Sequence, residues 1–229
     1  MELLCMEPRS SYDSTRTDHG VQFSRTTQWS TIRYDFLVDT YATERLKVLS
    51  TWNLFRDEDL PVRPRDDDNR GRSVREQMVH QCVSEDIWFR TMLGIDVQAP
   101  PLPEHETRSG FVARYGEDSA ARLAAIQSQE PSWWEAETDF FEVRRTRAWV
   151  MVRRIAHTAH HRGQQAAMLR MLGRDLYSTY GPTADTGGLM QDHAPTVYAF
   201  HDEAAILAGG PLTELPGPVG RAVTERPGS

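Results

Sequence analysis

Residues 156–173, AHTAHHRGQQAAMLRMLG, are the stretch that decides the fold. The stretch holds three of the eight histidines of the chain, contains no proline and ends at Gly173, a residue that often terminates helices. It therefore predicts the C-terminal half of a long helix that begins near Arg145.

Two of these histidines have a spacing that suits a metal ion. His157 and His161 are four residues apart, so on a helix they project from one face, one turn apart. Met168 continues this face, which indicates that it meets neighbouring helices rather than water. Two neutral imidazoles so placed form half of a metal site. The alternative is a pair of buried histidines satisfied by hydrogen bonds, and the spacing alone leaves both open.

Length and composition limit the classes of protein that fit. A chain of 229 residues can bury one core, and 39% apolar with 26% charged residues is typical of a soluble globular domain. A net charge of −7 gives no support for nucleic-acid binding, and no apolar run approaches the ~18 residues of a membrane span. The two cysteines, Cys5 and Cys82, do not indicate a disulfide framework. No secretion signal is evident at the N-terminus, so we expect a cytoplasmic protein.

Apolar periodicity and capping residues predict the rest of the fold. Ser73 followed by Glu76 forms a capping box, and Gly94 is a stop signal for the helix between them. Proline-rich, charged or aromatic-rich loops separate the helices, and the chain from 204 onward is expected to be disordered. The fold class is all-α, an up-and-down four-helix bundle. The four predicted helices span residues 30–55, 73–94, 109–128 and 145–172, and the aromatic-rich loop spans 129–144.

A third histidine lies in the middle of the second predicted helix. His80 sits beside an apolar face, and taken alone such a residue is more often a core histidine than a metal ligand. In a bundle, however, sites form where side chains of facing helices meet, and His80 is the remaining helical histidine that can join His157 and His161. Three imidazoles leave one coordination position open, which is the catalytic pattern.

Arginines dominate the charge of the histidine-bearing helix. Eight arginines and no acidic residue lie between Val143 and Arg174. Arg153, Arg154 and Arg162 are nearest the histidines and could bind an anionic substrate. The alternative is that these arginines pair with acidic residues elsewhere in the chain.

Two segments resemble a known family. HTAHHRGQQAAMLRMLG is similar to the last-helix signature of the DinB/YfiT-like superfamily, and MVHQCVSEDIWFRTMLG is similar to its second helix. The resemblance covers roughly residues 30–175, which leaves a flexible extension at 1–29 and an irregular tail at 176–229. It implies a four-helix bundle that holds a divalent metal, zinc or nickel, on His80, His157 and His161.

The resemblance implies the first two of three candidate functions, and the residues leave the third open. The first is a metal-dependent transferase that uses a low-molecular-weight thiol, such as glutathione, bacillithiol or mycothiol, on a small electrophile. The second is a hydrolase that uses metal-bound hydroxide, with His160 or Glu85 as the candidate base. The third is a non-enzymatic, metal-stabilised binding bundle. We expect a small-molecule substrate, no nucleic-acid or membrane partner, and a chain that can form a homodimer.

Overall fold

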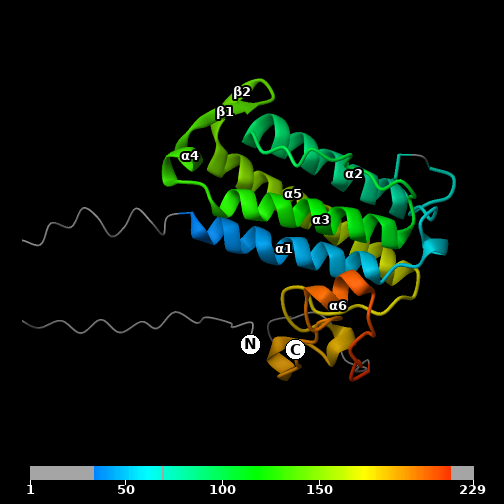
Figure 1. Ribbon diagram of the computed structural model, residues 1–229. Helices are drawn as coiled ribbons and strands as arrows, with labels where there is room; N and C mark the ends of the chain where they lie inside the picture. Colours follow the sequence, from blue (N-terminus) through cyan, green and yellow to red (C-terminus); the bar gives the residue numbers. More distant parts are fainter. Residues whose placement is uncertain (1–33, 69, 218–229) are drawn as a thin grey trace, which may run out of the picture.

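The computed structural model describes residues 34–217 apart from residue 69. The expected extension at 1–29, Cys5 and the end of the tail from 218 lie outside these residues. In the described part of the chain, no helix is long and apolar enough to cross a membrane. The same part contains four long helices that pack together (Figure 1): α1 Asp35–Asn53, α2 Val74–Ile87, α3 Arg108–Gln127 and α5 Arg147–Met171.

The second helix begins and ends as its sequence predicts. The Ser73 side chain accepts a hydrogen bond from the Glu76 backbone amide, and the Glu76 carboxylate accepts one from the Ser73 amide at 2.8 Å. Past Ile87 the helix continues as a π-helical turn, η2 Trp88–Leu93, and it ends at Gly94 with φ 71°. Glycine adopts this left-handed conformation without steric cost.

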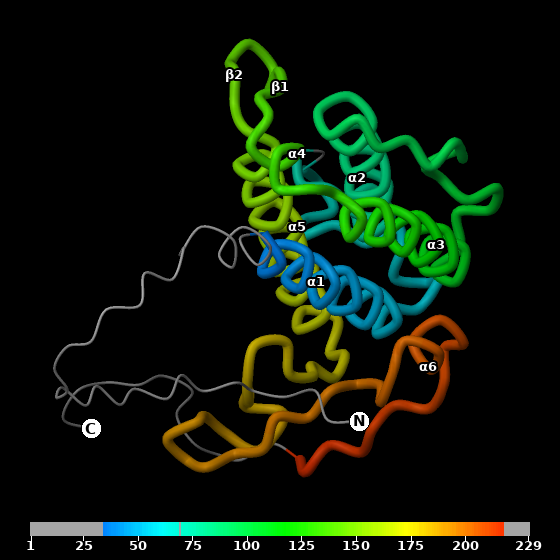
Figure 2. Tube along the Cα trace, turned by 60° about the vertical axis from the view of Figure 1, so that its left-hand side comes forward, coloured from blue at the N-terminus to red at the C-terminus, as the bar shows by residue number. Residues whose placement is uncertain are grey.

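The helices are not packed in simple chain order. Helix α1 packs mainly on α3 and α5, whereas α2 packs on α5 (Figure 2). The side chain of Arg122 on α3 donates a hydrogen bond to Asp86 on α2. The buried side chains form two apolar clusters, one around Trp52 on α1 and one around Phe89 in η2. Each large side chain buried in this way contributes roughly 1.5–3 kcal/mol.

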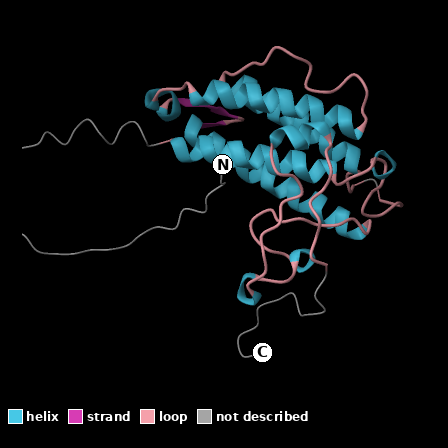
Figure 3. Cartoon of the chain, turned by 60° about the horizontal axis from the view of Figure 1, so that its bottom comes forward, coloured by secondary structure: helices cyan, strands magenta, loops and turns pink. Residues whose placement is uncertain are grey.

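The aromatic-rich segment 129–144 is not a loop, which corrects the sequence-based prediction. Pro131 opens a short helix, α4 Pro131–Glu135, because proline suits the first helical position. Strands β1 Glu137–Phe140 and β2 Val143–Thr146 then form an antiparallel hairpin (Figure 3). The protein is therefore mostly helical rather than all-α. Phe140 packs edge-on against Trp88 at 5.2 Å between ring centroids, so this segment covers one end of the bundle.

The C-terminal tail packs on the bundle. Two 3-10 turns, η3 Ala184–Thr186 and η4 Met190–Asp192, precede a short helix, α6 Glu203–Ala208, which contacts α1 and α3. The prediction of disorder from 204 is therefore wrong for residues 204–208. Asp202 caps α6 by accepting a hydrogen bond from the Ala205 amide at 2.8 Å, and Ile206 is buried. Gly116 of α3 lacks the side chain that would otherwise meet Leu207 of α6.

Candidate metal centre

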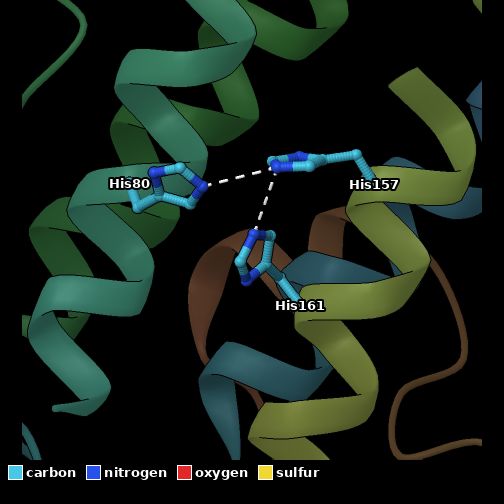
Figure 4. A group of neighbouring side chains, drawn as sticks. All are labelled: His80, His157 and His161. Atoms are coloured by element: carbon cyan, nitrogen blue, oxygen red, sulfur yellow. Dashed lines mark hydrogen bonds between the residues drawn. The ribbon is translucent and has the colours of Figure 1, made fainter. Parts of the chain in front are cut away.

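Three histidines from two helices converge between α2 and α5 (Figure 4). His80 projects from α2, and His157 and His161 project from adjacent turns of α5 (Figure 4). The His157 Nε2 atom lies 3.4 Å from His80 Nε2 and 3.2 Å from His161 Nε2. The structure thus brings together the three residues that the sequence singled out.

The spacing of these nitrogens fits a single metal ion. Zinc–nitrogen bonds of about 2.0–2.1 Å at a tetrahedral angle place two ligand nitrogens about 3.3–3.4 Å apart. The two distances at His157 nearly match this value, and the ligand atoms of all three residues lie within 4.8 Å of one another. Three imidazoles are a donor set suited to zinc or nickel. The residues present therefore fit a divalent ion.

Neighbouring amides orient the His161 ring. Its Nδ1 atom lies 2.8 Å from the amide oxygen of Gln77 and 3.0 Å from that of Gln164. An amide oxygen can only accept a hydrogen bond, so Nδ1 carries the proton and donates it. The lone pair of His161 is then on Nε2, the atom that faces the other two histidines. Outer partners of this kind are typical of metal-binding histidines.

An aromatic side chain holds the ring of His157. Trp88, the first residue of η2, stacks on this imidazole with 5.6 Å between ring centroids and 29° between planes. The guanidinium of Arg154 lies over the same indole at 5.5 Å. His157 Nδ1 is buried and has no hydrogen-bond partner among the residues that the structure describes. On the side of Nδ1, packing against Trp88 rather than a hydrogen bond therefore supports the orientation of this ring.

The environment of the cluster favours neutral imidazoles. Burial, followed by the charge of Arg154, lowers the pKa of His157 from 6.5 to about 3. Burial and the nearby His80 lower the pKa of His161 to about 4. Burial, with smaller contributions from Arg72 and Arg154, also lowers the pKa of His80. At neutral pH all three rings keep a free lone pair, which is the form that binds metal.

Two of the three arginines proposed to bind an anion are already paired inside the protein. Arg154 lies 3.5 Å from the Glu85 carboxylate and donates hydrogen bonds to Ser84 and Thr158. Arg162 is buried and pairs with Glu44. Of the three, only Arg153 is exposed. The alternative, in which these arginines pair with acidic residues, therefore describes Arg154 and Arg162.

The two candidate bases lie in different surroundings. His160 is exposed at the rim of the cluster, with its ring centroid 5.1 Å from that of His161. Glu85 is fully buried and accepts hydrogen bonds from Tyr41 and Tyr115, so its carboxylate is occupied in the core. Sequence reasoning missed Gln77 and Trp88 as neighbours of the site. Both contacts join α2 or η2 to α5, so they depend on how these elements pack against each other and have no local sequence signal.

The fold and the histidine cluster define a class, a helical bundle that can hold a divalent metal ion. The sequence of residues 37–188 matches the DinB family. Because this match spans more than half of the 229 residues, the chain belongs to the DinB family. None of the curated proteins matches the sequence.

Two solved structures with TM-scores of 0.58 and 0.50 show the same fold at low sequence identity, and a third structure also matches. A DinB-like protein from Bacillus cereus is 17% identical with a TM-score of 0.58, and the match covers 67% of this chain and 100% of that one. A DinB-like protein from Bacillus subtilis is 14% identical with a TM-score of 0.50, and the match covers 60% and 92%. YfiT from Bacillus subtilis, described as a probable metal-dependent hydrolase with an unusual four-helix bundle topology, is 17% identical with a TM-score of 0.49 over 66% and 94%.

Proposed function

We propose that this protein binds a divalent metal, zinc or nickel, through His80, His157 and His161, and acts as a transferase with a low-molecular-weight thiol on a small electrophile. The observation that carries the proposal is the convergence of three neutral imidazoles. The Nε2 atom of His157 lies 3.4 Å from that of His80 and 3.2 Å from that of His161. Three protein ligands leave a coordination position for a further molecule.

The chain's own cysteine does not supply the nucleophile in this proposal. Cys82 is the free cysteine of the described residues, and it is buried in the apolar cluster around Trp52. Burial, together with the charge of Glu85, raises the pKa of its thiol well above the ordinary value, so it stays protonated. A thiol nucleophile must then come from a second substrate. A divalent ion bound to the histidines would supply Lewis acidity, which favours a thiolate or an activated water near neutral pH.

His160 favours hydrolysis as the second candidate function. Its imidazole is exposed at the rim of the cluster, and its Nε2 atom lies 3.1 Å from the Gln164 amide nitrogen, which leaves Nε2 as an acceptor. This nitrogen could act as a general base toward water only after the hydrogen bond from Gln164 is exchanged for one from water. A non-enzymatic, metal-stabilised bundle is the third candidate, and it predicts that removing the histidines lowers the melting temperature without changing any turnover.

Cobalt substitution tests the proposal directly. The Co²⁺-loaded protein is titrated with glutathione, and then with bacillithiol and mycothiol, while its visible absorption is recorded. Binding of thiolate sulfur to the ion should add a charge-transfer band and shift the visible bands. The His161→Ala variant, which removes one ligand, is the control and should show neither change. An unchanged wild-type spectrum with all three thiols would reject the transferase and leave hydrolysis or binding.

A further inference from the structure

A cavity opens beside the N-terminal half of α2 and reaches the metal centre. Its volume is about 680 Å³, a size suited to a small molecule. Of the three clustered histidines, His80 lines this cavity. The other walls come from the loop before α2 and from the connector that leads to α3. The lining residues are Pro61, Arg63, Arg72, Ser73, Arg75, Glu76, Val79, His80, Val83 and Glu106.

Among the residues that the structure describes, two arginines of the cavity have no partner for their charge. Arg63 is neutralised, because it pairs with Glu76 at 2.5 Å and donates to the Gly71 carbonyl. By contrast, neither guanidinium of Arg72 and Arg75 makes an ion pair or a hydrogen bond with any residue that the structure describes, and both side chains are exposed. Unpaired cations in a protein of net charge −7 are available to bind an anion.

Arg72 and Arg75 lie in the same cavity as one ligand of the proposed metal centre. Arg72 lines the same cavity as His80, the histidine of the metal centre that faces it. Arg75 precedes His80 by five residues on α2, and both side chains line this cavity. A group bound by Arg75 would therefore lie within the reach of a small molecule from the His80 ring.

We propose that Arg72 and Arg75 bind an oxyanion of the substrate, a carboxylate or a phosphate, in this cavity, while the reacting end of the same molecule lies at His80. The proposal rests on the proposed function for the reacting end, whereas the anion site itself exists with or without a metal. It assigns anion binding to Arg72, in the loop before α2, and to Arg75 on α2, in place of the α5 arginines Arg154 and Arg162, which are paired with carboxylates.

Glu106, an acidic residue of the same cavity, provides a second test of the anion site. Glu106 is exposed and makes no ion pair with the described residues, so its charge opposes an anion held by Arg72 and Arg75. Removing this charge should strengthen anion binding, while removing either arginine should weaken it. A merely structural role for these exposed side chains predicts no such opposite pair of effects.

Calorimetric titration of the metal-free protein with inorganic phosphate and with succinate tests the anion site. Wild type should bind at least one of them, and Arg72→Gln and Arg75→Gln should each weaken binding about ten-fold, the effect expected for one charge-assisted contact. Glu106→Gln should tighten binding. Arg153→Gln, the matched control on α5, should leave it unchanged. Binding of phosphate alone or of succinate alone identifies the oxyanion that the site prefers.

Two results of the titration would contradict the anion site. The proposal would be overturned if wild type bound neither anion. It would also be overturned if binding were lost in Arg153→Gln and kept in Arg72→Gln and Arg75→Gln. Repeating the titration with zinc present tests the anion site separately from the proposed metal-dependent function. Anion binding by a protein that takes up no metal would reject the metal centre and keep the anion site, whereas metal uptake without anion binding would do the reverse.

Discussion

His161 shows how a single ring becomes a metal ligand through its neighbours. Its spacing from His157 puts both rings on one face of α5, but the tautomer depends on the amide oxygens at Nδ1, 2.8 Å from Gln77 and 3.0 Å from Gln164. Gln77 is buried on α2, whereas Gln164 is exposed on α5. The buried partner holds the ring more firmly, because water does not compete for its oxygen.

Replacing Gln77 should therefore weaken metal binding. In Gln77→Leu the buried acceptor for His161 Nδ1–H is lost, and the affinity for zinc should fall about 10- to 100-fold, the usual effect of removing such a partner. Competition with a chromophoric chelator measures this affinity. Gln77→Glu, which keeps an acceptor of similar shape, is the control and should retain tight binding. Equal affinities of wild type and Gln77→Leu would show that Gln77 does not orient the ligand.

The histidines were predictable from the sequence, whereas their neighbours were not. A four-residue repeat on a helix depends only on helix geometry, so the shared face of His157 and His161 follows from the chain alone. The contact of Gln77 with His161 depends on how α2 and α5 are placed against each other. The same holds for Arg154 and Arg162, whose buried carboxylate partners lie far away in the sequence.

At the scale of secondary-structure elements, one carboxylate connects the four long helices. Glu85 on α2 accepts hydrogen bonds from Tyr41 on α1 at 2.8 Å and from Tyr115 on α3 at 2.9 Å. It also lies 3.5 Å from Arg122 on α3 and 3.5 Å from Arg154 on α5. The side chains of Glu85 and Arg154 are fully buried, and that of Arg122 is 1% exposed. Glu85 thus stabilises the arrangement that brings α2 and α5 together at the histidines.

Removing the charge of Glu85 should destabilise the protein strongly. In Glu85→Gln the buried Arg154 loses its carboxylate, and breaking such a pair costs about 3–5 kcal/mol. Urea denaturation at neutral pH measures the loss in the free energy of unfolding. Glu117→Gln on α3 removes an exposed carboxylate that pairs with Arg114, and this control should change stability by less than about 1 kcal/mol. Similar stabilities for the two variants would contradict the role given to Glu85.

The long helices were easier to predict than the short elements. Helices α1, α2, α3 and α5 have apolar periodicity, and α2 also has a capping box and a glycine stop that the structure confirms. The hairpin β1–β2 has strands of only four residues, too short for an alternating pattern to be distinctive. Helix α6 is stable because it packs on α1 and α3, a contact that local sequence does not reveal.

At the scale of the whole molecule, the tail is attached to the bundle by hydrogen bonds to a buried ion pair. Glu44 on α1 pairs with Arg162 on α5 and accepts a hydrogen bond from Tyr180 of the tail at 3.1 Å. Burial alone would raise the pKa of Glu44, but hydrogen bonds from Lys47 and Arg162 outweigh it and hold this pKa below its ordinary value of 4.5. The carboxylate therefore favours the folded state whenever it is ionised.

Because of this ion pair, the free energy of unfolding should decrease at acid pH. Because the pKa of Glu44 is lower in the folded state, its contribution is present above the ordinary value and is lost as the pH falls through the folded-state pKa. Wild type should thus exceed Glu44→Gln in free energy of unfolding at neutral pH, and the difference should shrink at about pH 3. Urea denaturation at both pH values measures it. A difference that stays constant with pH would rule out this linkage.

The central claim is that His80, His157 and His161 hold a metal ion, and elemental mass spectrometry of the purified protein tests it most directly. Wild type should contain about one zinc or nickel ion per chain, since three imidazoles make one site. His80→Ala and His161→Ala should lose the metal, while His160→Ala, from the rim of the cluster, should keep it, with circular dichroism showing that each variant is folded. Folded wild type that contains no metal, and takes up neither zinc nor nickel on titration, would contradict the claim.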